Sequence, residues 1–186
     1  MSTRREQILQ ESVGLIARDG YAAFSMRAVA RASGLTLGAL QYHFPNRDTL
    51  LQAIAAHVTQ SYRHSFDAQH PTPGLKDVVS FVLLDAPGAA LQADRLFPQL
   101  WAMALVEPIM EELLDALYQQ YVELLEGCLL ARGAQAPHAE ALAIMGLLEG
   151  QLLFVGRGRR WEKSGPAVLE AVHALLDARY GEGRPQ

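Results

Sequence analysis

Apolar residues recur at steps of three and four along most of the chain, which is the spacing of an α-helix that buries one face. Leu9, Val13 and Ile16 form the first such stripe. Similar stripes follow over residues 25–33, 36–44, 46–62, 75–83, 96–104, 108–132, 137–155 and 164–176. Strand-like alternation and hairpin turns are scarce. The pattern therefore predicts an all-α protein of about nine helices.

The clearest local signals lie in residues 25–51. Ser25 can cap a short helix, and Gly34 can end it in the left-handed conformation that glycine tolerates. Thr36 can cap a second short helix, which Pro45 stops. Two short helices joined by a glycine turn predict a helix-turn-helix, a motif that places its second helix in the major groove of DNA.

The second helix of this motif is predicted to turn Leu40 and Phe44 inward, since they lie four residues apart. Gly38 then leaves the outer side shallow, so that the backbone can approach base edges, and the Gln41 amide suits the edge of adenine. The residues predicted to contact DNA are Ser25, Arg27, Thr36, Leu37, Gly38, Ala39, Gln41, Tyr42, His43 and Arg47.

Arg47 opens the next helix, where a cation is unfavourable unless a negative group lies near it. A DNA phosphate is the predicted partner. For Arg27 the alternative is a solvated surface residue, and for Tyr42 and His43 it is a side chain that packs on the motif or lies exposed at the helix end.

The same stretch resembles the DNA-binding domain of the tetracycline-repressor (TetR) family of bacterial transcription regulators, over roughly the first quarter of the chain. The shared features are Gly20-Tyr21, Ser25-Met26-Arg27, Val29-Ala30, Ala32-Ser33-Gly34-Leu35, Thr36, Gly38-Ala39-Leu40, Tyr42-His43-Phe44-Pro45, Arg47 and Leu50-Leu51. Leu37 and Gln41 depart from the lysine and tyrosine that the family often has there. The resemblance implies a helix-turn-helix head over residues 1–47 and an effector-binding and dimerisation body over residues 48–186.

Charge and composition narrow the function. The net charge is −4, but residues 1–47 hold six arginines against three acidic residues, a net +3, so the remainder carries −7. A basic head on an acidic body can still approach phosphates. A single cysteine excludes an internal disulfide and suits a cytoplasmic protein. Nucleophile–base pairs, metal-ligand spacings and phosphate loops are not evident, so we expect no enzyme activity, no metal and no cofactor. No uninterrupted apolar run approaches the roughly 20 residues of a membrane span, so we expect no membrane association.

The body contains a set of aromatic, sulfur-containing and amide side chains that suits a mostly apolar ligand pocket. These predicted ligand-binding residues are Phe97, Trp101, Met103, Tyr118, Tyr121, Met145, Gln151 and Phe154. The same residue types also fill ordinary helical cores. The candidate charged anchors are Glu107 and the arginines of residues 157–160, although those arginines also suit the end of a helix.

Small residues at three- and four-residue steps mark the helix predicted over residues 137–155, and they would let a second helix approach closely. The resemblance implies that the last two helices pair with their copies in a homodimer. The predicted interface residues are Ala143, Gly146, Gly150, Leu169, Val172 and Leu176. Close packing within one chain is the alternative.

Together these features predict a cytoplasmic, ligand-responsive repressor that binds a palindromic double-stranded DNA operator as a dimer and is released by a small, mostly apolar effector. One alternative is an architectural DNA-binding dimer without an effector. Another is a helical-bundle carrier of small molecules, which would leave Gly38, Tyr42 and Arg47 without a role.

Overall fold

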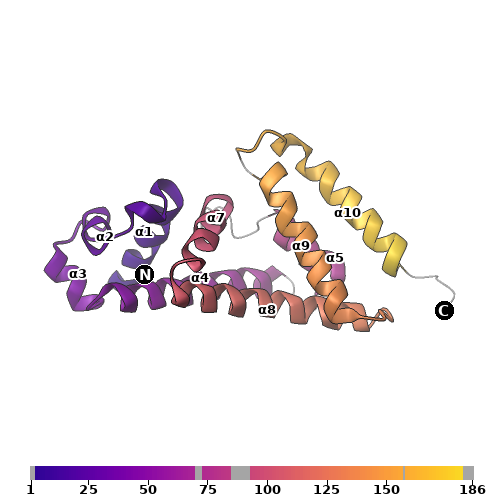
Figure 1. Ribbon diagram of the computed structural model, residues 1–186, viewed down its shortest axis with the longest axis horizontal. Helices are drawn as coiled ribbons and strands as arrows, with labels where there is room; N and C mark the ends of the chain where they lie inside the picture. The colour runs from indigo at the N-terminus through magenta and orange to yellow at the C-terminus, as the bar shows by residue number, and fades with distance from the viewer. Residues whose placement is uncertain (1–2, 70–72, 85–92, 157, 182–186) are drawn as a thin grey trace. The chain divides into compact units, whose positions relative to one another are not determined.

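The computed structural model describes residues 3–69, 73–84, 93–156 and 158–181 (Figure 1). Within these ranges the chain forms nine α-helices and two 3-10 helices and contains no β-strand. The all-α prediction is therefore confirmed, as is the expected number of helices.

The helices begin and end close to the predicted capping and breaking residues. Their bounds are α1 Arg4–Asp19, η1 Tyr21–Ala23, α2 Met26–Ala32, α3 Leu37–His43, α4 Arg47–Gln69, α5 Leu75–Leu84, α7 Ala93–Ala104, α8 Pro108–Leu130, α9 Pro137–Val155, η2 Glu162–Ser164 and α10 Gly165–Tyr180. At the start of α1, Thr3 and Glu6 form a capping box, in which each side chain bonds the other residue's backbone amide.

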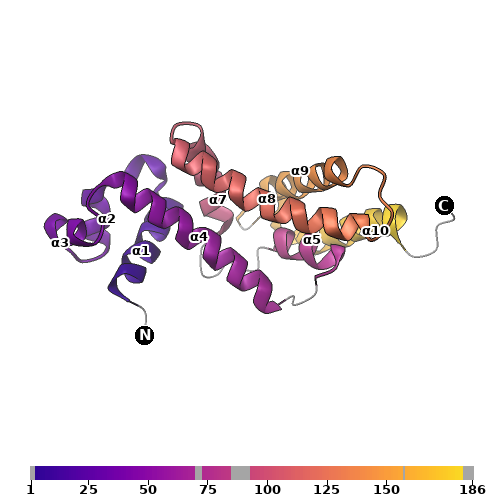
Figure 2. The same ribbon diagram turned by 90° about the horizontal axis from the view of Figure 1, so that it is seen from below.

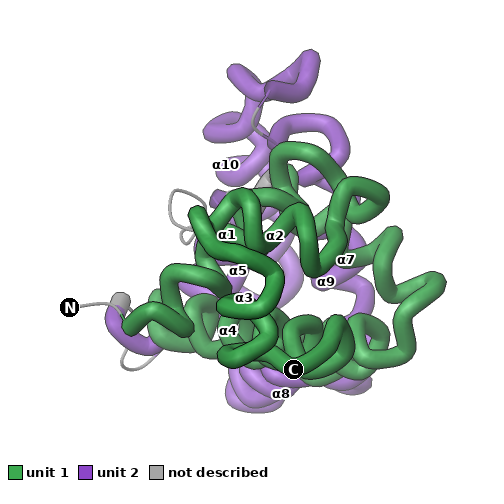
Figure 3. The backbone as a smooth tube through the Cα atoms, turned by 90° about the vertical axis from the view of Figure 1, so that its left-hand side faces the viewer, with its two compact units in different colours: residues 1–65, 87–117 green, residues 66–86, 118–186 purple. Residues whose placement is uncertain are grey.

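The chain divides into two compact units, coloured separately in Figure 3: residues 1–65 with 87–117, and residues 66–86 with 118–186. The first unit contains α1, α2, α3 and α7, most of α4 and the start of α8. In it α7 packs on α1 and η1, and the Gln99 side chain accepts a 3.1 Å hydrogen bond from the Tyr21 backbone amide. The compact unit is thus larger than the head of residues 1–47, and the functional division after residue 47 stays a prediction.

The second unit is built around α5, which packs against both α9 and α10 (Figure 2). Val78 and Val79 of α5 are fully buried, as are Ala141 and Leu148 of α9. An aromatic cluster lies within this unit. The ring centroids of Phe66 and Phe81 are 4.9 Å apart, and Tyr121 of α8 lies 6.5 Å and 6.3 Å from them.

Helix α9 is more apolar over its whole length than the sequence analysis indicated, and the expectation of no membrane association stays untested. By length and composition alone it could cross a membrane: it has 19 residues, a mean hydropathy of 1.3 in its most apolar stretch, and only 22% of that stretch is buried. Glu140 and Glu149 interrupt the apolar run without making the helix polar on average. The structure therefore contains a long apolar helix that is largely exposed in the single chain, and this exposure has to be explained.

Candidate nucleic-acid interface and effector site

The helix-turn-helix is held by two caps and one glycine turn. The Ser25 hydroxyl accepts a 3.2 Å hydrogen bond from the Ala28 amide at the start of α2, and the Thr36 hydroxyl accepts one of 3.2 Å from the Ala39 amide at the start of α3. Between the two helices Gly34 has φ +65°, a left-handed conformation that costs glycine little. These local bonds fix where α3 begins.

Burial then fixes which way α3 faces. Leu40 and Phe44 are fully buried, as the four-residue spacing predicts. On the opposite side Gln41 is exposed and the Tyr42 side chain is 87% exposed. No atom lies within 4 Å of the position that a Cβ on Gly38 would take. The outer face of α3 is therefore shallow, polar and open.

The other predicted DNA-contacting residues surround this face. Ser25, Arg27 and Thr36 are exposed, whereas Leu37, Ala39 and His43 are half-buried. The His43 and Tyr42 rings meet edge to face with centroids 5.4 Å apart, so the two aromatic side chains lie together at the end of α3.

Two arginines of α1 tie that helix to the motif. Arg4 donates to the Ser33 carbonyl oxygen over 2.8 Å, and Arg5 donates to the His43 carbonyl oxygen over 3.0 Å. The Arg5 guanidinium also lies 4.3 Å from the centroid of the Phe44 ring. Both arginines thus satisfy carbonyls at helix ends. Only their basic character was visible in the sequence, because their partners lie 29 and 38 residues away.

Arg47 has a negative partner within the chain that its local sequence did not reveal. Its guanidinium lies 2.7 Å from a carboxylate oxygen of Glu107 and also contacts the Tyr21 hydroxyl, which donates to the same carboxylate. The negative partner that a cation at the start of α4 needs is thus supplied by the chain itself. Glu107 was considered as a ligand anchor, but this ion pair occupies it.

Residues 8–54 match the family model described as bacterial regulatory proteins of the tetR family. A nicotine-responsive transcriptional repressor of Paenarthrobacter nicotinovorans is 30% identical over 95 residues, which cover 50% of this chain and 48% of that protein. Residues 8–54 therefore carry the DNA-binding motif of the tetR family of bacterial regulatory proteins. The chain spans about half the length of this curated relative in the match.

Solved structures extend the likeness in fold to nearly the whole chain. A TetR-family regulator of Rhodococcus sp. superposes with a TM-score of 0.76 at 23% identity, covering 95% of this chain and 98% of its own. A regulator of Saccharomonospora viridis, solved in complex with choline, gives a TM-score of 0.75 at 19% identity and covers 93% and 95%.

The predicted ligand-binding residues divide between the two units of the chain. Phe97, Trp101 and Met103 belong to the first, and Phe97 packs edge to face on Tyr62 with centroids 5.3 Å apart. The remaining predicted ligand-binding residues, Tyr118, Tyr121, Met145, Gln151 and Phe154, belong to the second unit. Met103, Tyr121 and Met145 are buried, whereas Phe154 is 51% exposed and lies 6.0 Å from the Trp161 ring.

Glu149 of α9 is a residue that the sequence analysis missed. Tyr118 of α8 hydrogen-bonds its carboxylate, while Oε2 is buried and has no hydrogen-bond partner. Burial raises the pKa of Glu149 to about 7, and the bond from Tyr118 opposes that rise only in part. A single carboxylate in the apolar run MGLLEGQLLF was the available signal. Arg157, one of the arginines considered as an anchor, lies outside the described residues.

The predicted dimer-interface residues differ in how far they are buried within the chain. Val172 and Leu176 of α10 are 3% and 6% exposed, so their side chains are already covered within the chain, and a place for them in an interface stays a prediction. Leu169 and Gly150 are half-buried, whereas Ala143 and Gly146 are exposed on α9. The sequence period identified apolar positions on α10 but not which surface covers them.

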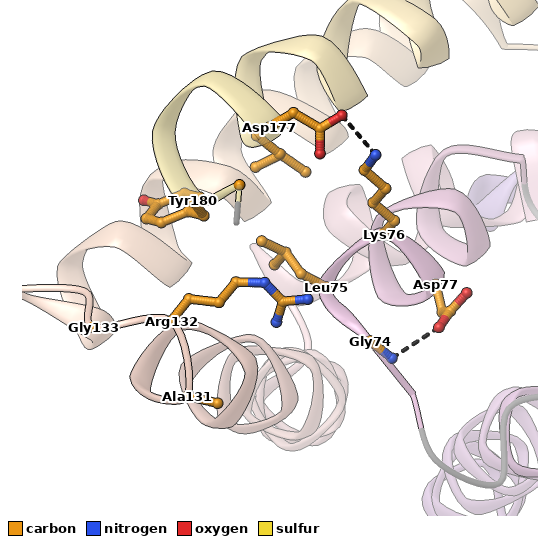
Figure 4. Close-up of a pocket in the computed structure, with 11 residues that line it drawn as sticks. Gly74, Leu75, Lys76, Asp77, Ala131, Arg132, Gly133, Asp177 and Tyr180 are labelled. Carbon is orange, nitrogen blue, oxygen red and sulfur yellow. Dashed lines mark hydrogen bonds and ion pairs between the residues drawn. The ribbon is translucent and has the colours of Figure 1, made fainter. Parts of the chain in front are cut away.

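An open hollow of about 1010 Å³ lies at the ends of α5, α8 and α10 in the second unit (Figure 4). Lys76 pairs with Asp177 across it over 2.7 Å, and the Asp77 carboxylate accepts a 2.8 Å bond from the Gly74 amide. None of the predicted ligand-binding residues lines this hollow. Across the described ranges, no group of three or more His, Cys, Asp or Glu residues is placed to hold a metal ion.

The ion pair of Arg47 and Glu107 is expected to contribute to stability. In a double-mutant cycle with Arg47→Gln and Glu107→Gln, measured by urea unfolding, we expect a coupling free energy of about 1 kcal/mol, because the Glu107 side chain is only 19% exposed. The Lys76–Asp177 pair has the same 2.7 Å separation but side chains 48% and 57% exposed. It is the matched control and should show coupling close to zero; equal coupling in both pairs would contradict the role of burial.

Glu149 is expected to make stability depend on pH. Its pKa in the folded chain, about 7, exceeds the ordinary value of 4.5. The folded state therefore holds a proton that the unfolded state has lost, and stability falls as pH rises between these values, by up to about 3 kcal/mol. Glu149→Gln should unfold at a higher urea concentration than the wild type at pH 8, with the difference shrinking toward pH 5. Glu170→Gln, at an exposed position of α10, should show no such pH-dependent gain.

Proposed function

We propose that this chain is a cytoplasmic TetR-family transcriptional repressor that binds a palindromic DNA operator as a homodimer and is released by a small, mostly apolar effector. The single observation that carries the proposal is the outer face of α3. Within the segment that matches the family, that helix is capped, anchored by two buried side chains and open on the other side.

The proposed contacts follow from that geometry. With nothing within 4 Å of a Cβ at Gly38, the α3 backbone can approach base edges there. The exposed Gln41 amide can pair with adenine N6 and N7, and the Tyr42 hydroxyl can donate to a phosphate. We assign no phosphate contact to Arg47, because it would have to leave Glu107 first.

Dimerisation is proposed from the uncovered face of α9. At about 100° per residue, Ala143, Gly146 and Gly150 fall within ~60° of one another on this helix. The larger exposed side chains Leu142, Leu147, Leu153 and Phe154, which are 51%, 37%, 52% and 51% exposed, flank them on either side. Small residues between apolar flanks are what a closely packed partner helix requires. A copy of the same helix, related by two-fold symmetry, would cover this face and place two α3 helices on successive major grooves, about 34–36 Å apart.

The effector role is proposed from relatives and from the second unit. One relative is a nicotine-responsive repressor, and one similar structure was solved with choline. In the second unit an aromatic cluster and a buried carboxylate offer the apolar walls and the polar anchor of a ligand site. Release then requires only that the effector bind better to a dimer whose heads do not fit the operator.

Sequencing the genomic DNA fragments retained by the purified protein tests the proposal, because a repressor of this kind should enrich one palindrome. Titrating small molecules into the resulting complex separates a regulator from an architectural dimer. An architectural dimer would retain the operator at every concentration of a compound that binds the body.

Two variants on α3 should weaken DNA binding in different ways. Gln41→Ala should relax the preference at one base pair by about 1–3 kcal/mol, because one bidentate contact is lost. Tyr42→Ala should weaken binding on all sequences alike and leave the salt dependence nearly unchanged, because the neutral hydroxyl bonds a phosphate without releasing a counterion. Gln60→Ala, at an exposed position farther along α4, is the control and should change neither. Binding by fluorescence anisotropy at several salt concentrations measures both effects, and unchanged binding in all three variants would refute the recognition role of α3.

Gly146→Glu should convert the dimer into a monomer. The Gly146 site is open, so the side chain fits the single chain, but it would place bulk and charge between two α9 helices. Gly127 of α8 is also exposed, helical and open, which makes Gly127→Glu the matched control. Either change should leave the fold intact, since replacing a helical glycine gains up to about 1 kcal/mol. Sedimentation velocity should show a monomer for the first variant only; dimers of both would contradict the α9 interface.

A further inference from the structure

Glu149 is a carboxyl group inside the second unit whose charged form has no cationic partner among the described residues. Its Oε2 is buried without a hydrogen-bond partner, and its only described bond comes from Tyr118. A buried carboxylate normally needs a cation or several donors to offset its lost hydration. A residue that leaves one oxygen unpaired therefore lowers the stability of the free protein and needs another explanation.

The elements that pack against α9 do not supply that cation. Of the charged residues on α5, Lys76 is paired with Asp177, and Asp77 bonds the start of its own helix. On η2, Glu162 accepts a bond from the Gly158 amide and Lys163 is exposed, and on α10 the Arg179 guanidinium is paired with Glu140. Among the described residues, only burial and Tyr118 shift the pKa of Glu149, so no neighbouring cation acts on it.

The hydrogen-bond donor of this carboxylate lies next to an aromatic cluster along α8. Tyr118, its hydrogen-bond donor, is one helical turn before Tyr121 on α8. Tyr121 belongs to the cluster with Phe66 and Phe81. The faces of such rings attract cations, and a carboxylate beside aromatic rings is a combination that binds ammonium groups. A ligand without a hydrogen-bond donor would leave Oε2 unpaired, and an anionic ligand would place a second negative charge next to it.

We propose that Glu149 and Tyr118 form the charged end of the effector site, and that the effector is an organic cation: a quaternary or protonated amine on an apolar body. This rests on the proposed function, because it names the chemical class of the effector that the second unit would bind. Glu149 neutralises the ammonium group, Tyr118 orients the carboxylate, and the surrounding aromatic side chains cover the apolar part. The pKa of about 7 supports this, since it reports a carboxylate that lacks a positive partner in the free protein.

Cations and their neutral isosteres of equal shape test the proposal. Calorimetry at pH 8 would measure binding of choline beside 3,3-dimethylbutan-1-ol, and of benzyltrimethylammonium beside neopentylbenzene. We expect at least one cation to bind the wild type about thirtyfold or more tightly than its isostere, as for other buried charge pairs. Glu149→Gln keeps the shape of the side chain and should remove that preference. Glu170→Gln, exposed on α10, should keep it.

Three outcomes would overturn the proposal: no cation preferred by the wild type, a preference that survives in Glu149→Gln, or a preference that Glu170→Gln loses equally. Thermal unfolding of each variant shows that it is folded before binding is measured. The assay contains no DNA, so its result does not depend on operator recognition. A chain that binds cations but retains no palindromic DNA would contradict the repressor function and leave the cation site standing. A chain that retains a palindrome but does not prefer cations would contradict the cation site and leave the repressor function standing.

Discussion

The burial of Leu40 and Phe44 is the constraint on which the proposed DNA-binding surface depends. Two side chains four residues apart remove one side of α3 from water, and because a helix is rigid, this sets the direction of every other residue on it. The caps at Ser25 and Thr36 determine where the helices start, and the left-handed turn at Gly34 determines the angle at which α3 leaves α2. Gly38, Gln41 and Tyr42 are then presented outward without further support. The open face is a consequence of the packed one.

In the first unit, a cation at the start of one helix is neutralised by a carboxylate far along the chain. Arg47 lies where the α4 dipole disfavours a cation, and Glu107 lies directly before α8, where the dipole favours an anion. Their 2.7 Å contact and the Tyr21 hydroxyl bring the beginnings of α4 and α8 together. Both helices continue beyond the first unit. A ligand-driven shift in either helix would therefore act on a polar contact next to the helix-turn-helix rather than on an apolar surface that can slide.

Local rules predicted the helices and the motif, because caps, a glycine turn and a three- to four-residue stripe are written into neighbouring residues. Local rules cannot show the partner of a side chain when that partner is distant in sequence. Glu107, which pairs with Arg47, lies 60 residues away. Arg5 bonds a carbonyl 38 residues away, and Val172 and Leu176 are covered within the chain although their spacing suited a partner helix equally well. Apolar periodicity shows that a face is buried but does not show against what.

Helix α9 carries both the exposed apolar face and the unpaired Glu149 carboxylate of the second unit. Its buried side carries Ala141, Ile144 and Leu148, while its small and large apolar residues on the other side are uncovered. Glu149 lies at the border, at ~60° from Gly146 around the helix axis. A partner helix packed on the exposed side would leave the Glu149 carboxylate inside each chain, and a cation bound to that carboxylate would press on the helix that the partner touches. Effector binding and dimer geometry would then be coupled through a single rigid helix, without a longer pathway between them.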